Sequence, residues 1–201
     1  MHNIDFAIYA VHLATWGAFG LTLLYLGRKG ETTSTAAAPA PQAQQVATAP
    51  YSRALVMLHM LAFGVMYFGI ANAVIPNRVP ILFPLQRLAG TLVIAAGAAL
   101  MVWALIWFRS WRFRAQIEAG HQLATGGPFR FMRHPIYGGL NLLALGSALW
   151  VPTPILWVAL ALMILGSDLR GRAEEKVLAT AFGDEYRNYC ARTKRFIPGI
   201  Y

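Results

Sequence analysis

Hydrophobic residues form long uninterrupted runs along this chain, and polar residues gather in the segments between them. Three runs, at 4–26, 54–75 and 88–108, are each long enough to cross a bilayer as a helix. Two shorter runs follow at 135–150 and 155–169, separated by a proline-containing break. The pattern predicts an all-α, multi-pass membrane protein with about five transmembrane helices, the last two forming a short helical hairpin.

The last two runs are each short for an independent span. A re-entrant hairpin is therefore the alternative to two crossing helices. Apolar residues keep a helical spacing beyond 169, so we expect the fifth helix to continue to about 181. This extension would form a C-terminal helix outside the apolar layer.

The composition of the segments divides the chain into four parts. These are a first transmembrane helix at 1–29, a low-complexity linker rich in Ala, Pro, Thr and Gln at 30–52, transmembrane helices two and three at 53–121, and a motif loop, hairpin and C-terminal helix at 122–201. The first five residues carry no Lys or Arg, and the basic pair Arg28-Lys29 follows the apolar run. A signal peptide has the opposite order, so we expect the first helix to be retained.

Charge supports a membrane protein and also orients it. Only 12% of residues are charged, about half the share of a typical soluble domain. The net charge of +9 would suit nucleic acid, but fifteen of the seventeen Lys and Arg residues fall in segments on one side of the bundle. Only Arg78 and Arg87 fall on the other side. The positive-inside rule places the N-terminus outside and residues 122–201 at the cytosolic face. The expected partner is the bilayer and no nucleic acid.

Two further features bear on setting and metal chemistry. Cys190 is the single cysteine, which excludes an internal disulfide and a cysteine-cluster metal site. We expect no metal. The Ala/Pro/Gln-rich linker and the compact size favour a bacterial inner membrane.

Candidate chemistry is concentrated in two charged segments. The first, 122–139, reads QLATGGPFRFMRHPIYGG. Proline at the first turn of a helix is common, so His134 could simply cap the fourth helix. Alternatively, backbone donors at this helix start could form an anion site together with Arg133. Gly138 and Gly139 would let a flat ligand or another helix approach the backbone.

The second segment, 170–189, reads RGRAEEKVLATAFGDEYRNY. Its simplest interpretation is an amphipathic helix held on anionic lipid by its cations. Glu174 and Glu175 count against that interpretation, because an anionic surface repels adjacent carboxylates. Arg170 and Glu174 are spaced for an ion pair on one helix face.

Together the two segments resemble the integral-membrane methyltransferases, a superfamily that includes isoprenylcysteine carboxyl methyltransferases and phospholipid N-methyltransferases. The first half of the shared pattern stands here as Leu123, Thr125, Gly127, Pro128, Phe129, Arg130, Phe131, Arg133, His134, Pro135, Tyr137 and Gly139. The second half stands as Arg170, Glu174, Glu175, Leu178, Phe182, Gly183, Tyr186 and Tyr189. The resemblance covers about 123–198, and 1–85 match no motif.

The resemblance implies that S-adenosylmethionine binds at the cytosolic membrane face, between the Arg-His-Pro segment and the Glu-Glu helix. The residues expected at the cofactor are Gly127, Pro128, Arg133, His134, Pro135, Tyr137, Gly138, Glu174 and Glu175. The expected catalytic residues are Arg133, His134, Arg170 and Glu175. The two glutamates would serve the ammonium or sulfonium, and His134 or Glu175 could take a proton from an amine acceptor. The resemblance also implies that Arg170 orients an anionic acceptor, and from the sequence alone pairing with Glu174 is an equal alternative.

We therefore expect methyl transfer to a lipophilic acceptor in the membrane. A prenylcysteine-like carboxylate, a phospholipid amine and a hydrophobic thiol stay open. The leading alternative is a non-enzymatic haem-binding bundle with His12 and His59 as axial ligands. A small transporter, or a lipid-binding scaffold that lost activity, is the second alternative. The sequence carries no prediction of oligomeric state.

Overall fold

The computed structural model describes residues 2–34, 52–108 and 123–201. Its helices are α1 (His2–Ser34), α2 (Ser52–Val74), α3 (Gln86–Trp107), the short 3-10 helix η1 (Gly127–Arg130), α4 (Pro135–Trp150) and α5 (Pro154–Arg192). Within those ranges no strand occurs beyond one isolated bridge between Met132 and Lys194. The all-α, multi-pass membrane architecture predicted from the apolar runs is confirmed.

The helix bounds follow the apolar runs closely, with one exception. α4 has the predicted bounds, and α2 and α3 begin two residues earlier and end one residue earlier than their runs. α1 continues eight residues past its run, so 30–34 are helical, and the prediction of a linker is wrong there. Leaving the apolar layer does not end a helix, and the first residue that would break this one is Pro39. The remainder of the predicted linker, 35–51, lies outside the described residues.

α5 spans 39 residues, with a break at Gly183, and contains both the fifth apolar run and the predicted C-terminal helix. Its uninterrupted part before Gly183 is about 44 Å long, which exceeds the apolar thickness of a bilayer, so its charged second half extends beyond that layer. The helix turns sharply at Gly183, where φ is 52° and ψ is −120°. Only glycine adopts this conformation without strain. The predicted continuation to 181 is confirmed.

Four of the described helices, α1, α2, α3 and α5, are long and apolar enough to cross a membrane. α4 has 16 residues and is about 24 Å long, which is shorter than the apolar layer. α4 packs along the longer helix α3. The short hairpin of α4 and α5 thus joins one short helix to the longest helix of the fold.

Four glycines bring α3 and α4 into backbone contact. Gly97 faces Gly139, and a Cβ built on either would lie 2.7 Å from the carbonyl oxygen of the other. Gly90 and Gly146 form an equivalent pair with the same 2.7 Å distances. The glycines of each helix are two turns apart, so the two antiparallel helices meet twice along one seam. Close packing of small residues replaces the hydrophobic effect as the force that joins helices in lipid.

Two buried histidines connect the helices inside the bundle. His12 of α1 hydrogen-bonds through Nδ1 to Tyr67 Oη and through Nε2 to Ser147 Oγ, both at 3.0 Å. His59 of α2 contacts the backbone carbonyl one turn earlier at 3.2 Å and Ser167 Oγ at 3.4 Å. Both ring nitrogens of each histidine have a partner, as buried polar groups require. No observation in the described residues favours the pair as axial ligands of a haem.

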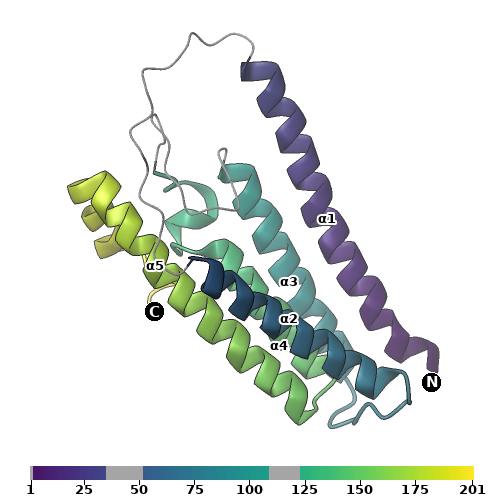
Figure 1. Ribbon diagram of the computed structural model, residues 1–201. Helices are drawn as coiled ribbons and strands as arrows, with labels where there is room; N and C mark the ends of the chain where they lie inside the picture. Colours follow the sequence, from purple (N-terminus) through teal and green to yellow (C-terminus); the bar gives the residue numbers. More distant parts are fainter. Residues whose placement is uncertain (1, 35–51, 109–122) are drawn as a thin grey trace.

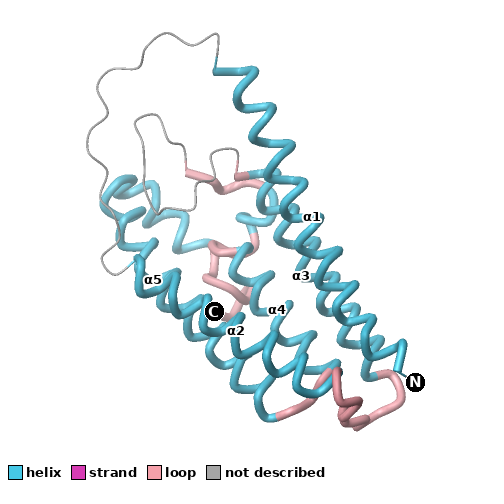
Figure 2. The backbone as a smooth tube through the Cα atoms, turned by 45° about the vertical axis from the view of Figure 1, so that its right-hand side comes forward, coloured by secondary structure: helices cyan, strands magenta, loops and turns pink. Residues whose placement is uncertain are grey.

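The helices alternate in direction, so successive connections lie at opposite ends of the bundle (Figure 2). The short connections at 75–85 and 151–153 lie at the end where Asp5 of α1 accepts a 2.7 Å hydrogen bond from Arg87. Gln86 secures this end, because its side-chain amide donates to the carbonyls of Pro80 and Trp150 at 2.7 and 2.9 Å. The start of α4 and the charged part of α5 lie at the other end. Which end faces the cytosol stays a prediction.

Candidate functional site

The Arg-His-Pro segment begins with a turn that two glycines make possible. Gly127 has a φ of 55°, and a Cβ there would lie 2.5 Å from the indole Cγ of Trp107. Gly126 lies against the same indole ring. η1 therefore docks directly on the end of α3. The carbonyl of Phe129 in η1 accepts a 2.7 Å hydrogen bond from the hydroxyl of Tyr189, which joins η1 to the last part of α5.

The C-terminal segment after α5 pairs with the Arg-His-Pro backbone. The amide of Arg133 donates to the carbonyl of Lys194 at 2.8 Å, and the amide of His134 donates to that of Arg195 at 3.1 Å. Two backbone donors of the expected anion site are therefore engaged by the chain itself. His134 is the N-cap residue of α4, but its side chain makes no capping hydrogen bond. The imidazole instead faces the two glutamates of α5.

Glu175 is the centre of a mostly buried charge cluster. Its Oε1 accepts hydrogen bonds from Nε of Arg133 and Nε of Arg195, both at 2.9 Å, and its Oε2 accepts one from Nη2 of Arg195 at 2.7 Å. Its side chain is 15% exposed, and those of the two arginines are 12% and 13% exposed. The hydrogen bond that Arg195 donates to Glu175 raises the pKa of Arg195 above its usual range. Such charge-assisted bonds are the strong ones.

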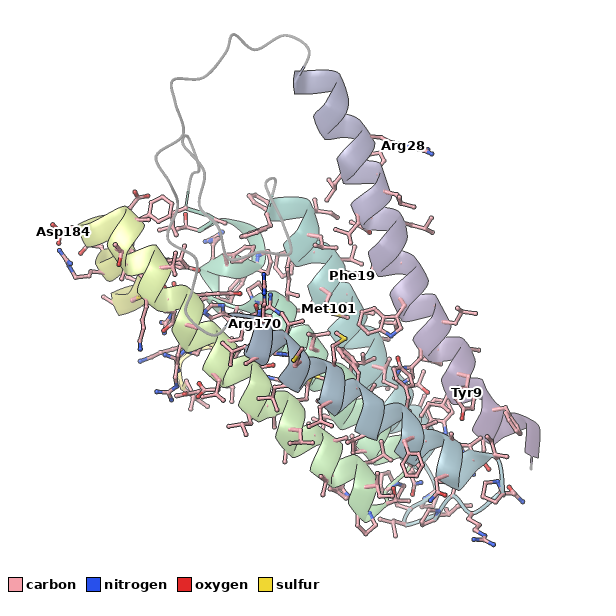
Figure 3. The ribbon with its side chains drawn as sticks, in the orientation of Figure 1. Tyr9, Phe19, Arg28, Met101, Arg170 and Asp184 are labelled. Atoms are coloured by element: carbon pink, nitrogen blue, oxygen red, sulfur yellow. The ribbon has the colours of Figure 1, made fainter. Side chains whose placement is uncertain are left out.

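Glu174 holds a second group of side chains on the same helix. Its Oε1 accepts hydrogen bonds from the hydroxyl of Tyr137 and, at 3.3 Å, from Nε of Arg170. The guanidinium of Arg170 also lies over the Tyr137 ring, 5.5 Å from its centroid. In Figure 3, Arg170 lies among other side chains within the bundle, and Asp184, on the last part of α5, lies far from it.

The imidazole of His134 lies between the two carboxylates. Its Nδ1 is 3.7 Å from Glu174 Oε2, and its Nε2 is 3.2 Å from Glu175 Oε1. The ring stacks on Tyr137 with centroids 5.6 Å apart. Gly171 makes room on α5, because a Cβ there would lie 3.3 Å from the imidazole. The arrangement places one titratable ring between two carboxylates at the end of an apolar bundle.

The structure brings most of the sequence-predicted site residues together, but not all in the same way. Six of them, from α5 and the start of α4, form the two connected groups: Arg133, His134, Tyr137, Arg170, Glu174 and Glu175. Pro135 is the first residue of α4. Gly127 and Pro128 are buried in η1, and the Cα of Gly138 lies against Met132, whose sulfur would be 3.1 Å from a Cβ there.

Sequence reasoning missed the residues of the C-terminal segment. Arg195 binds Glu175 and also donates to Asp168 at 3.0 Å. Arg133 donates to the carbonyl of Thr193 as well. The available signal was a basic residue just beyond the motif, which does not by itself indicate that this segment returns to pair with residues 133 and 134.

Tyr186 lies near this cluster and differs from its neighbours. It is 3% exposed, and its hydroxyl has no hydrogen-bond partner among the described residues. Its ring packs beside that of Tyr189, with centroids 6.1 Å apart. The turn at Gly183 directs this last part of α5 back onto the site.

These features define an integral-membrane methyltransferase fold with a charged site at one end. Residues 85–185, half of the chain, match the phospholipid methyltransferase family, and the chain belongs to that family. The chain is similar over nearly its whole length to the solved structure of the eukaryotic intramembrane Ras methyltransferase, an isoprenylcysteine carboxyl methyltransferase. That match has a TM-score of 0.63 at 21% identity and covers 98% of this chain and 68% of that one, which shows a shared fold.

Curated relatives match this chain over part of their length. The chain is 34% identical over 88 residues to a probable protein-S-isoprenylcysteine O-methyltransferase of Oryza sativa subsp. indica, which covers 43% of this chain and 46% of the relative. It is 31% identical over 84 residues to protein-S-isoprenylcysteine O-methyltransferase B of Arabidopsis thaliana, covering 41% and 43%. The matched region spans less than half the length of these relatives.

Proposed function

We propose that this protein transfers a methyl group from S-adenosylmethionine to a lipophilic acceptor, at the membrane face that holds the charged cluster. One observation carries the proposal. In the region that matches the family and the segment just after it, an imidazole lies between two carboxylates that pair with three arginines, at the end of an apolar helical bundle. The residues concerned are Arg133, His134, Arg170, Glu174, Glu175 and Arg195.

The side chains present fit this cofactor. S-adenosylmethionine carries a carboxylate, an ammonium, a sulfonium and an adenine, so its site needs cations, carboxylates and aromatic surface. Arg133, Glu174 and Tyr137 provide one group of each kind within the connected cluster. When bound, the cofactor supplies an electrophilic methyl group. The protein then contributes alignment and exclusion of water, which are the main sources of rate in an in-line displacement.

The two glutamates receive different roles in this proposal. Glu175 accepts three hydrogen bonds from two arginines and also faces His134, so it positions Arg133 and His134. Glu174 accepts fewer hydrogen bonds than Glu175, and we assign it to the ammonium or sulfonium side of the cofactor. His134, held between them, is the group placed to take a proton from an amine acceptor. A carboxylate or thiolate acceptor would need no base.

The acceptor and the orientation are also proposals. The name of the family points to a phospholipid amine, whereas the names of the relatives point to an isoprenylcysteine carboxylate. Arg170, beside Tyr137 and Glu174, is placed to orient an anionic acceptor. The distribution of fifteen of seventeen cations supports a cytosolic site.

The test begins with calorimetric titration of S-adenosylmethionine and S-adenosylhomocysteine into detergent-solubilised protein. We expect micromolar binding that weakens more than tenfold in Glu174→Gln and Arg133→Ala. Arg187→Ala is the matched control on α5, because the ion-pair partner of Arg187 among the described residues is the exposed Asp184. Methyl transfer is then measured with a prenylcysteine analogue, phosphatidylethanolamine and an alkyl thiol. Folded wild-type protein that binds neither ligand at millimolar concentration would refute the proposal.

A further inference from the structure

The hydroxyl of Tyr186 is a buried polar group without a hydrogen-bond partner in the described part of the chain. We infer that Tyr186 is a binding residue for the amino-acid end of the cofactor, an inference that rests on the proposed function. Tyr186 is 3% exposed, and no described residue satisfies its hydroxyl. Buried hydroxyls are nearly always paired, because leaving one without a partner destabilises the folded state.

A neighbour on the same helix shows what a structural tyrosine looks like here. Tyr189, three residues on, is equally buried, and its hydroxyl donates to the carbonyl of Phe129 at 2.7 Å. That hydrogen bond fixes the last part of α5 to η1. Tyr186 has the same backbone setting without such a bond. The thiol of Cys190, one turn after Tyr186, lies near enough to influence the hydroxyl but does not form a hydrogen bond of acceptable geometry with it. A thiol is in any case a weak hydrogen-bonding partner.

The position of Tyr186 indicates which part of a ligand it would meet. Burial and the negative charge of Glu175 raise the pKa of Tyr186, and the positive charge of Arg133 lowers it, so the hydroxyl lies within electrostatic range of the charged cluster. The amino-acid end of the cofactor is a zwitterion, whereas its adenosine part is uncharged. A phenolic hydroxyl can donate to a carboxylate or accept from an ammonium. The zwitterion is therefore the part that matches these surroundings.

Gly183 explains why the hydroxyl is in this place at all. Its φ of 52° turns the chain between Glu175 and Tyr186, and nothing lies within 4 Å of where a Cβ would be. A straight continuation of α5 would carry Tyr186 and Tyr189 away from the Arg-His-Pro segment. The turn places two tyrosines on the site, and among the described residues only the hydroxyl of Tyr189 has a hydrogen-bond partner.

The experiment compares Tyr186→Phe with Tyr189→Phe in full-length, detergent-solubilised protein. Two quantities are measured for each variant: the melting temperature without ligand, and the dissociation constants of S-adenosylhomocysteine and 5′-methylthioadenosine, which lacks the amino-acid end. For Tyr186→Phe we expect an unchanged or higher melting temperature, affinity for S-adenosylhomocysteine reduced at least tenfold, and unchanged affinity for 5′-methylthioadenosine. Tyr189→Phe should lower the melting temperature.

Three results would overturn the inference while leaving the proposed function intact. They are wild-type affinity of Tyr186→Phe for S-adenosylhomocysteine, a loss of stability equal to that of Tyr189→Phe, and an equal loss of affinity for both ligands. The first shows no contact, the second a structural hydrogen bond, and the third a contact to the nucleoside. Folded wild-type protein that fails to bind S-adenosylhomocysteine would refute the proposed function, and the inference with it.

Discussion

Glu175 joins three parts of the chain through its hydrogen bonds. It lies on α5 and accepts hydrogen bonds from Arg133 of the Arg-His-Pro segment and from Arg195 of the C-terminal segment. Removing its carboxylate in Glu175→Ala leaves two mostly buried guanidiniums next to each other. We therefore predict a loss of stability as well as a loss of cofactor binding.

The size of the effect follows from the geometry. Removing one partner of a buried ion pair costs about 3–5 kcal/mol, because the remaining charge is left without compensation. Both arginines are at least as buried as Glu175, but Arg195 keeps its ion pair with Asp168, so only Arg133 is left without a carboxylate and the lower end of this range applies. In a domain of this size the loss lowers the melting temperature by on the order of 10 °C. The exposed pair of Arg187 and Asp184 contributes about 0–1 kcal/mol at most.

Thermal unfolding of Glu175→Ala, Glu175→Gln and Arg187→Ala in the same detergent measures this difference. We expect both Glu175 variants to melt well below wild type and Arg187→Ala to melt at the wild-type temperature. Adding Arg133→Gln to Glu175→Gln should restore part of the loss, because it removes the cation that has lost its carboxylate partner, whereas Arg195 still pairs with Asp168. A Glu175→Ala protein with wild-type melting would show that the cluster does not hold these segments together, and the reasoning would be wrong.

Three other substitutions test the fold and the limits of the site. Gly139→Ala should separate α3 from α4 and lower the melting temperature, because its Cβ would lie 2.7 Å from the carbonyl of Gly97; Gly64→Ala, with nothing within 4 Å, is the control and should melt at or above wild type. Gly183→Ala should weaken binding of S-adenosylhomocysteine at least tenfold, measured by calorimetry, because alanine does not adopt its φ of 52°. Replacing 35–48 by a Gly/Ser segment of equal length should leave that affinity unchanged, and a loss would show that the linker contributes to the site.

The sequence predicted the helices well because lipid imposes one simple rule. A helix in the bilayer must satisfy its backbone internally, so an apolar run of sufficient length indicates a helix and approximately its ends. The rule stops at the membrane surface, where it placed the end of the first helix at 26 although α1 continues to Ser34. The rule also gives no end for the fifth helix. Its continuation past 169 was predicted from the helical spacing of apolar residues instead.

The site was predictable in part, and only from its pattern. The resemblance brought the Arg-His-Pro and Glu-Glu segments together, but it did not say which side chain meets which. The partner of Glu175 on the C-terminal segment depends on backbone pairing between Arg133 and Lys194, 61 positions apart. No local pattern carries such a contact. Likewise, nothing in the sequence distinguishes Tyr186 from Tyr189, although only Tyr189 is hydrogen-bonded in the described structure.

The adjacent glutamates become intelligible once His134 is placed between them. Consecutive residues of a helix point about 100° apart, so two neighbouring carboxylates cannot share one small partner on the same side. An imidazole solves this problem because its two nitrogens lie on opposite edges of the ring. Nδ1 faces Glu174 at 3.7 Å, and Nε2 faces Glu175 at 3.2 Å. The two glutamates therefore hold one ring at a fixed angle, and each carboxylate also pairs with at least one arginine. With a single glutamate at either position, the stacking on Tyr137 and one carboxylate contact would remain to orient the ring.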